Sequence, residues 1–231
     1  MGAAGRWLLW ILLLGVVGVL LVQAWYAVHI LWWRDHAPHE TAFMAMREAE
    51  LKERGKQPHL SYRWVPYERI SPALKRAMIA AEDAKFVEHE GFDWDGIQRA
   101  IEKNYRRGRV VAGGSTITQQ LAKNLFLSSQ RSYWRKAQEA LITLMLEAML
   151  DKRRIFELYL NVIEWGDGVF GCEAASRRYF GIGADEIDAA QAARLAAMAP
   201  NPRYYERHPD ARGLARKIPI IMARMPAAEL P

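Results

Sequence analysis

Glu82 is the first residue whose type and position could do chemistry. It lies on one face of a predicted helix that begins at Ser71-Pro72, and apolar residues recur on that face at four-residue spacing. These residues are Leu74, Met78 and Phe86. An apolar environment disfavours the charged form of a carboxylate, so we expect a raised pKa for Glu82. Such a carboxylate suits a general base that takes a proton from a sugar hydroxyl near neutral pH.

The surroundings of Glu82 leave a plainer interpretation open. A glutamate at a helix edge often pairs with a nearby base, and Lys85 and Arg76 both stand close in sequence. His89 favours the functional interpretation because it shares the helical face of Phe86. A single histidine is also a common structural hydrogen-bond partner, so both interpretations stand at this point.

A glycine-rich turn and a helix with several amide side chains form the second candidate region. Gly113-Gly114 permits a tight turn, and Ser115 or Thr116 can cap the helix predicted over Thr116–Leu127. Backbone N–H groups at such a helix start attract an anion. Donors for phosphate or sugar oxygens are added by Gln119, Gln120, Lys123 and Asn124. Thr116 and Gln119 also match a capping box, which is compatible with anion binding because a cap orders the same amides.

Two further acids, Glu139 and Glu147, lie in a predicted helix that is otherwise almost entirely apolar. Buried carboxylates are uncommon without a partner. Arg135 stands one turn before Glu139 and is either its structural partner or a phosphate ligand. Glu82 and Glu139, on separate helices, resemble the two carboxylates of glycosyl chemistry.

The elements that must position these residues are helices. The chain of 231 residues has room for one catalytic-sized domain and one small appendage, and its 51% hydrophobic content excludes a mainly disordered chain. Helices are predicted at Ser132–Leu150, Arg153–Val162, Gly171–Phe180, Asp188–Ala199 and Arg212–Met225, in addition to the two above. Alternating strand patterns are almost absent. The fold class is therefore mainly α.

The amino end predicts a membrane anchor. Residues 7–33 contain no Asp, Glu, Lys or Arg, and a helix of that length crosses a hydrocarbon layer of about 30 Å. A cleavable signal peptide is the alternative, but its apolar region covers only about 7–15 residues and precedes small residues rather than aromatic ones. Charges on both flanks leave the orientation open. We assign residues 1–34 to a terminal stub and transmembrane anchor.

Charge and composition divide the rest of the chain. Residues 35–70 are polar with mixed charge and predict a linker or stalk with a short solvated helix, and residues 71–231 form the main domain. The net charge of +6 suits an anionic lipid surface, a phosphate-bearing substrate or nucleic acid. Within residues 93–112 the bases Arg99, Lys103, Arg106, Arg107 and Arg109 form either a patch for anionic headgroups or an ordinary solvated face. The single Cys172 can form neither an internal disulfide nor a zinc site.

Four motifs in order carry a resemblance to a known family. They are Glu82-Asp83-x-x-Phe86-x-x-His89, then Gly113-Gly114-Ser115-Thr116-Ile117-Thr118-Gln119-Gln120-Leu121-x-Lys123-Asn124, then Arg135-Lys136-x-x-Glu139, then Lys152-x-x-Ile155-x-Glu157-x-Tyr159-Leu160-Asn161. The chain resembles the peptidoglycan glycosyltransferases, and among them the monofunctional, membrane-anchored biosynthetic transglycosylases. This resemblance implies a lysozyme-like, two-lobed glycosyltransferase domain behind one transmembrane helix.

The resemblance also implies a reaction. A glycan strand joined to undecaprenyl diphosphate is transferred with inversion onto the 4-hydroxyl of lipid II, a lipid-linked disaccharide-pentapeptide. Glu82 matches the catalytic base and Glu139 the second essential acid, while Lys123, Arg135 and Lys136 match cations that neutralise the diphosphate. The implied substrate-binding residues are Asp83, Phe86, His89, Gly114, Ser115, Thr116, Gln119, Gln120, Lys123, Asn124, Arg135, Lys136 and Asn161.

Location, cofactors and partners follow from the same resemblance. The main domain is expected on the outer, periplasmic face of the cytoplasmic (inner) membrane, with the amino-terminal stub in the cytoplasm. A divalent cation, Mg²⁺ or Mn²⁺, is compatible with the diphosphate, and no organic cofactor is expected. Expected partners are lipid II, the lipid-linked strand, the membrane, and transpeptidases or other division or elongation proteins, but not nucleic acid. No Ser-x-x-Lys motif occurs, so cross-linking is expected to fall to other proteins.

Two rival functions stay open at the level of sequence. A hydrolase or lytic transglycosylase acts on the same glycan and also depends on a glutamate, but cleavage of finished polymer leaves no diphosphate for the cations to hold. A non-enzymatic membrane scaffold is the other rival, and in that case replacing Glu82 would change nothing.

Overall fold

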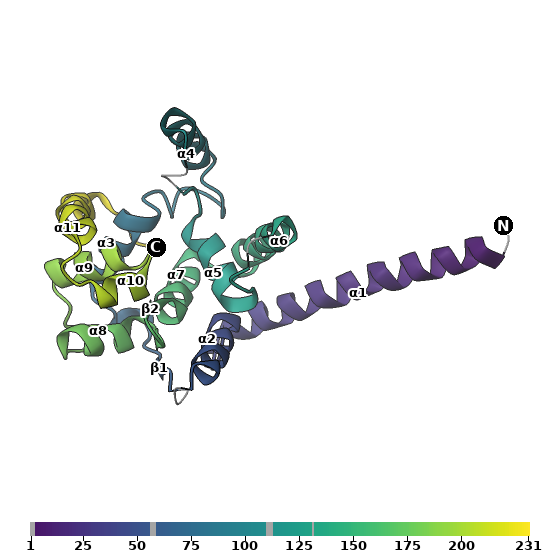
Figure 1. The fold of residues 1–231 in the computed structure, drawn as a ribbon, viewed down its shortest axis with the longest axis horizontal. Coiled ribbons are helices and arrows are strands. Elements are labelled where there is room, and N and C mark those ends of the chain that lie inside the picture. Colours follow the sequence, from purple (N-terminus) through teal and green to yellow (C-terminus); the bar gives the residue numbers. More distant parts are fainter. Residues whose placement is uncertain (1–2, 56–58, 110–112, 131) are drawn as a thin grey trace.

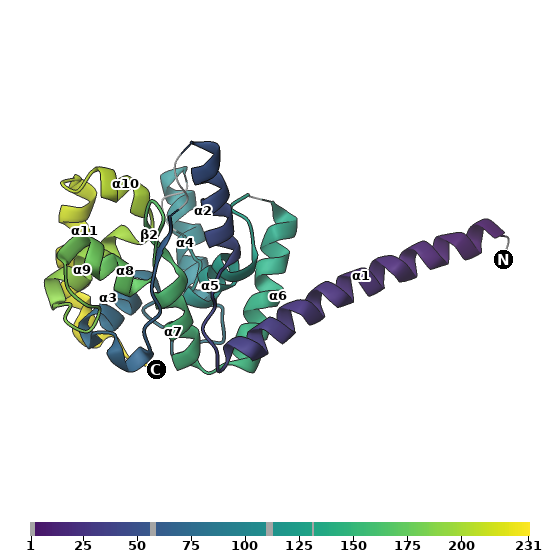
Figure 2. The same ribbon diagram turned by 90° about the horizontal axis from the view of Figure 1, so that it is seen from below.

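A long apolar helix projects from a body of shorter helices (Figures 1 and 2). The structure is a computed structural model that describes residues 3–55, 59–109, 113–130 and 132–231. The helices are α1 (Ala3–Trp33), α2 (Ala42–Glu53), α3 (Pro72–Glu82), α4 (Trp94–Arg107), α5 (Ile117–Phe126), α6 (Tyr133–Met149), α7 (Lys152–Val162), α8 (Cys172–Phe180), α9 (Ala189–Met198), α10 (Pro202–Arg207) and α11 (Arg212–Arg224). The predicted mainly α class is confirmed.

Side-chain caps explain why the helices begin where they do. Ser71, Thr116 and Ser132 each accept a hydrogen bond from a backbone N–H in the first turn of the next helix. Asp151 and Asp188 do the same for α7 and α9. A cap satisfies a donor that has no partner inside the helix, so it fixes the first residue. Each helix predicted after residue 115 begins and ends within one residue of its observed bounds.

Helix α1 is the described helix that is long and apolar enough to cross a membrane. Its side chains between residues 9 and 22 are exposed, whereas Ile30 and Trp33 near its end are buried. Trp33 packs on Phe126 of α5 with ring centroids 5.1 Å apart, and Gln23 donates a hydrogen bond to Gln138 of α6 at 3.1 Å. The last turns of the span are therefore fastened to α5 and α6.

The core is helix on helix. Helix α7 is buried along most of its length, and it packs on α5, while α3 packs on α9 and α11. In Figure 1, α3 and α8–α11 gather at one end of the body, and α5 and α6 lie toward α1. The catalytic candidates on α3 and α5 thus come from two neighbouring groups of helices.

A small sheet that the sequence did not predict packs against α8 and α10. Its strands are β1 (Ser61–Tyr62), β2 (Glu164–Gly166) and β3 (Val169–Phe170), in the order β1-β3-β2. Strand β1 runs parallel to β3, with Ser61 opposite Val169 and Tyr62 opposite Phe170, and β2 runs antiparallel to β3. Strands of two or three residues are too short to show an alternating pattern in sequence.

The short helix predicted within residues 35–70 is present, but the prediction that it is solvated is wrong for its middle. Helix α2 packs on α5, and Arg47 in its middle is only 1% exposed. The guanidinium of Arg47 donates to Glu164 of β2 at 2.7 and 3.0 Å. A buried, paired arginine of this kind fixes α2 to the main domain. The boundaries at residues 34 and 70 remain predictions.

Helix α4 occupies most of the basic segment for which the sequence predicts a charged patch or a solvated face. Figure 1 shows α4 standing apart from the other helices of the body. Its large apolar side chains Trp94, Ile101 and Tyr105 are exposed by 71%, 63% and 88%. The predicted bases Arg99, Lys103, Arg106, Arg107 and Arg109 are exposed as well, and residues 110–112 of this segment lie outside the described residues.

Candidate active site

Glu82 is the last residue of α3 and lines a cavity of about 200 Å³. The other walls of this cavity come from α9, from Pro200 in the loop after α9, and from α11, which contributes Lys217. One carboxylate oxygen of Glu82 accepts a hydrogen bond from Nε2 of Gln120 at 2.8 Å. The end of α3 therefore presents an acid to a cavity while α5 supplies its hydrogen-bond donor.

Burial raises the pKa of Glu82 above its usual value. The hydrogen bond from Gln120 and the charge of Lys217 lower the pKa in part, and the neighbouring charge of Asp83 raises it. The raised proton affinity expected from the sequence is thus confirmed in direction. A carboxylate that holds a proton more tightly than usual is better suited to general-base chemistry near neutral pH.

The alternative ion pairs of Glu82 are not formed. Lys85 pairs instead with Asp95 at 3.2 Å, and Arg76 donates to the carbonyl oxygen of Ala228 at 2.7 Å. The interpretation of Glu82 as an ion-paired residue at a helix edge is therefore wrong in this structure.

Gln120 is held by Tyr159, a residue to which the sequence assigned no role. The hydroxyl of Tyr159 donates to Oε1 of Gln120 at 3.1 Å, and this directs the amide nitrogen of Gln120 to Glu82. Burial, together with the charges of Glu82 and Asp83, raises the pKa of Tyr159 well above its usual value, so this phenol stays protonated and donates. The chain Tyr159–Gln120–Glu82 fixes the orientation of the acid.

A second cavity of about 290 Å³ adjoins the first. Gln120, Lys123, Asn124 and Tyr159 line it, and Pro200 lines both cavities. Nζ of Lys123 lies 5.0 Å from the ring centroid of Phe43 on α2. We use the term catalytic cleft for these two cavities together. Its lining includes the carboxylate of Glu82, the ammonium groups of Lys123 and Lys217, and the amides of Gln120 and Asn124, which can contact a sugar phosphate.

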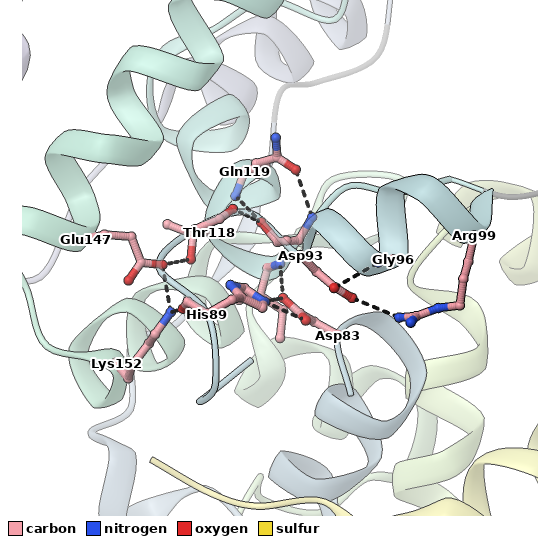
Figure 3. Close-up of polar contacts among 12 residues, drawn as sticks. Asp83, His89, Asp93, Gly96, Arg99, Thr118, Gln119, Glu147 and Lys152 are labelled. Atoms are coloured by element: carbon pink, nitrogen blue, oxygen red, sulfur yellow. Dashed lines mark hydrogen bonds and ion pairs between the residues drawn. The ribbon is translucent and has the colours of Figure 1, made fainter. Parts of the chain in front are cut away.

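Asp83 supplies the anion at the start of α5 (Figure 3). Its carboxylate accepts a hydrogen bond from the backbone N–H of Ile117 at 3.0 Å and pairs with Nε2 of His89 at 2.9 and 3.1 Å. Thr116 and Gln119 form the predicted capping box in both directions. The helix start therefore binds an anion, as its geometry predicts, but that anion belongs to the protein. Asp83, His89 and Thr116 position α5.

Glu147 also helps to position α5 (Figure 3). It accepts a hydrogen bond from the hydroxyl of Thr118 at 2.6 Å and from Nζ of Lys152 at 2.8 Å. Lys152 also donates to the carbonyl oxygen of His89. An acid on the apolar helix α6 is thus paired, and it joins α5, α7 and the loop after α3.

Two residues expected to bind substrate lie in the core instead. Phe86 and Asn161 are both 0% exposed. Phe86 packs on Phe156 at 5.5 Å between ring centroids, and Asn161 exchanges two hydrogen bonds of 2.9 Å with the backbone of Val65. A substrate cannot reach either side chain in this arrangement, so the assignment is corrected. These residues hold the helices that carry the cleft.

Glu139 is buried beside two cations. It is 3% exposed, and it accepts a hydrogen bond from Arg135 at 2.7 Å and another from Lys136. Lys136 also lines a cavity of about 260 Å³ with Gly114, Ser115 and Gln119. Arg135 is therefore a structural partner of Glu139, and Lys136 connects this ion pair to the glycine-rich turn.

Comparison with known proteins decides the family. The profile described as Transglycosylase matches residues 48–226, most of the chain. The chain belongs to the transglycosylase family. It is 62% identical to a biosynthetic peptidoglycan transglycosylase of Methylobacillus flagellatus over 95% of this chain and 96% of the relative. It is 62% identical to one of Dechloromonas aromatica over 98% of both chains, and 61% identical to one of Chromobacterium violaceum over 94% of this chain and 95% of the relative.

The transglycosylase offers no resident site for a divalent cation in the part of the chain that is described. Those residues contain no group of three or more His, Cys, Asp or Glu side chains that could hold a metal ion. The oxygens of Glu139 are occupied by Arg135 and Lys136. Mg²⁺ and Mn²⁺ prefer several oxygen ligands. The described residues alone therefore offer no complete donor set, a divalent cation at the diphosphate stays a prediction, and no step below depends on one.

Sequence reasoning missed two residues of the transglycosylase site. Tyr159 lies within the fourth motif, so its place in a predicted buried helix could have suggested a role. Lys217 lies on α11, far along the chain from Glu82, and only the packing of α11 on α3 brings the two together. No local sequence signal marks Lys217.

Proposed function

We propose that this transglycosylase polymerises glycan strands during cell-wall synthesis. It transfers the lipid-linked strand onto the 4-hydroxyl of lipid II with inversion and releases undecaprenyl diphosphate. Its similarity to the biosynthetic peptidoglycan transglycosylases supports the reaction class. The observation that carries the proposal is Glu82, a carboxylate of raised pKa that lines a cavity and accepts an oriented amide hydrogen bond.

In the proposed reaction Glu82 acts as the general base. It takes the proton of the acceptor hydroxyl, the hydroxyl oxygen forms a bond to the anomeric carbon of the donor, and the bond from that carbon to the diphosphate oxygen breaks. The new bond forms on the face opposite the leaving group, which inverts the configuration. Gln120, held by Tyr159, keeps Glu82 in one orientation for this step.

Cations near the cleft neutralise the leaving diphosphate. Lys123 lines the cavity next to Glu82 and presents an ammonium group there. Lys136 lines a separate cavity with the glycine-rich turn while it binds Glu139. Charge-assisted hydrogen bonds from such groups stabilise a phosphate more strongly than neutral donors do. We assign Glu139 the role of holding Arg135 and Lys136 in place.

The exposed apolar side chains support a location at a bilayer. Helix α1 has the length and composition of a span, and it is fastened to α5 and α6. On α4, exposed apolar residues stand beside exposed bases, a pattern typical of helices at a lipid interface. We propose that α1 anchors the chain in the cytoplasmic membrane, that the body lies on the outer face, and that transpeptidases cross-link the strands it makes.

The full-length protein in detergent or lipid vesicles tests this function. Incubation with lipid II, with and without divalent cation, should give long glycan strands and free undecaprenyl diphosphate. Solubilisation of finished cell wall without polymerisation would favour the hydrolase or lytic transglycosylase. Neither activity, from folded protein with intact vesicle binding, would favour the scaffold.

Glu82→Gln tests the assigned base. Removal of a general base costs about 10²–10⁴-fold in rate, so we expect a loss of this size with an unchanged melting temperature. Glu88→Gln is the matched control because Glu88 is an exposed acid on the loop that follows. Equal rates for the two variants would remove Glu82 from the mechanism.

A further inference from the structure

A polar cavity of about 830 Å³ adjoins the catalytic cleft. Four arginines and two acids line it: Arg54, Arg178, Arg203, Arg207, Asp167 and Glu206. They come from α8, α10, the loop between β2 and β3, and the residue that ends α2. We call this space the arginine cavity. Asn201 and Arg203 line both it and the cavity of Gln120 and Lys123, so the arginine cavity continues the catalytic cleft.

The ion pairs within the arginine cavity are long. Arg178 lies 3.4 Å from Glu206, and Arg203 lies 3.7 and 3.8 Å from Glu50 and Glu164. The nearby buried Arg47 takes the closest contact with Glu164, at 2.7 Å. A guanidinium has five N–H donors, and pairs at these distances leave most of them to the solvent. The side chains of Arg54, Arg178 and Arg203 are accordingly 51%, 61% and 41% exposed.

Arg207 adds a further guanidinium to this cavity. Its Nε donates to the carbonyl oxygen of Arg203 at 3.0 Å, and its side chain is exposed. Across the described ranges, no ion pair within 4 Å joins Arg207 to a carboxylate. The cavity therefore offers a surplus of guanidinium donors to an incoming anion.

The position of the arginine cavity favours a water-soluble anion. In Figures 1 and 2, α8 and α10 lie at the end of the body farthest from the free end of α1. A bilayer crossed by α1 lies on the opposite side. An anion that reaches the cavity must project away from the lipid while it remains near the sugars in the cleft.

We propose that the arginine cavity binds carboxylates of the peptide that the lipid-linked substrate carries. The inference rests on the proposed function, which places a disaccharide-pentapeptide in the catalytic cleft. A peptide carries at least its terminal carboxylate, and guanidinium groups bind carboxylates with two parallel hydrogen bonds. The peptide extends from the cleft past Arg203 toward Arg178 and Arg207.

A comparison of two substrates tests the proposal with the full-length protein. One is lipid II with free peptide carboxylates, and the other is lipid II with those carboxylates converted to amides. The variant is Arg178→Gln combined with Arg207→Gln, since neither residue belongs to the catalytic cleft. Arg69→Gln is the matched control, because Arg69 is 66% exposed and lies 3.7 Å from Asp185 outside this cavity.

For the free-carboxylate substrate, the double variant should raise KM about three- to twentyfold, as expected for two exposed charge pairs, and leave kcat within about twofold. For the amidated substrate, the wild type and the double variant should have the same KM. Added salt should reduce the difference between the two substrates for the wild type. The control variant should behave as wild type with both.

Three other outcomes would overturn the assignment, and a fourth would overturn the proposed function. If KM changes equally for both substrates, or changes for neither, the arginines do not bind the peptide carboxylates. Loss of binding to anionic vesicles by the double variant, without a change in KM, would assign the cavity to lipid headgroups. Failure of the wild type to polymerise either substrate would contradict the proposed function itself, which the other outcomes leave intact.

Discussion

Glu82 and Glu139 are two carboxylates on neighbouring groups of helices, and their surroundings differ in kind. Glu82 lines a cavity and accepts a hydrogen bond from one neutral amide. Glu139 is 3% exposed and binds two cationic side chains. In the sequence both are acids on helices with apolar faces, so only their hydrogen-bond and ion-pair partners distinguish the two residues.

The difference between the partners implies a difference in role. A neutral donor with burial favours a carboxylate that can accept a proton, because the raised pKa of Glu82 reflects an incompletely stabilised charge. Two cations instead neutralise the charge of Glu139, and the acid in return holds Arg135 in place and keeps Lys136 beside the glycine-rich turn. We infer that the first acid moves a proton and the second organises charge.

Replacement of each acid by glutamine should separate these roles most strongly. Glu82→Gln should lower the rate of polymerisation about 10²–10⁴-fold and leave the melting temperature unchanged. Glu139→Gln leaves two cations around a neutral amide, and we expect it to destabilise the fold by about 1–3 kcal/mol as well as reduce the rate. Thermal unfolding and lipid II turnover, measured on the same preparations, give both numbers.

The comparison fails if the two variants behave alike. A Glu139→Gln variant with normal stability and a lost acid limb in its pH–rate profile would make Glu139 a second proton carrier. Glu139→Asp is a useful control because it keeps the charge but shortens the reach to Arg135.

Asp83→Asn should show that Asp83, the acid next to the general base Glu82, positions α5 and does not bind substrate. Its carboxylate holds His89 and the backbone N–H of Ile117, and hydrogen bonds to a charged group contribute about 1.5–3 kcal/mol. We expect a loss of stability of this order, and a fall in kcat that follows from displacement of α5. Denaturant unfolding measures the first, and Asp83 would instead be a substrate ligand if only KM changed.

Local signals made most of the fold predictable. The caps Thr116, Ser132 and Asp188 are readable in sequence, and the helices that follow them begin where the caps predict. Helix α4 was missed because its apolar positions are interleaved with bases, so composition suggested a charged patch before periodicity suggested a helix. The packed state of α2 depends on the pair between Arg47 and Glu164, which are far apart in the chain.

The site was less predictable because it also depends on contacts between residues that are far apart in the chain. Glu82, Gln120 and Lys123 were predicted and lie together in the cleft. Phe86 and Asn161 match the family motifs just as those residues do, but their side chains are buried in the core. A motif records which residues a site requires and does not separate contact with the substrate from support of the helices. Three-dimensional packing makes that distinction.

Tyr159→Phe tests how far the orientation of Glu82 depends on its support. The variant removes one neutral hydrogen bond of 3.1 Å, which contributes about 0.5–1.5 kcal/mol, so the rate should fall by about two- to tenfold. The phenyl ring fills the same space, and stability should change little. Steady-state polymerisation by the variant measures the effect, and an unchanged kcat would mean that Gln120 needs no support from Tyr159.

Lys217→Met should have the smallest effect near neutral pH and the most specific one across the pH range. The charge of Lys217 lowers the pKa of Glu82, so its removal raises that pKa. A general base works in its ionised form, which exists above its pKa, and the acid limb of kcat/KM should therefore move to higher pH. At pH values well above the acid limb the rate should match that of the wild type, and Lys217→Arg should restore the original profile.

Two other outcomes would change this interpretation. If the acid limb stays in place in Lys217→Met but disappears in Glu82→Gln, Glu82 remains the base and Lys217 does not alter its pKa. If the acid limb remains in Glu82→Gln, another group causes it, and the assignment of Glu82 as the proton acceptor and Glu139 as the charge organiser would be wrong.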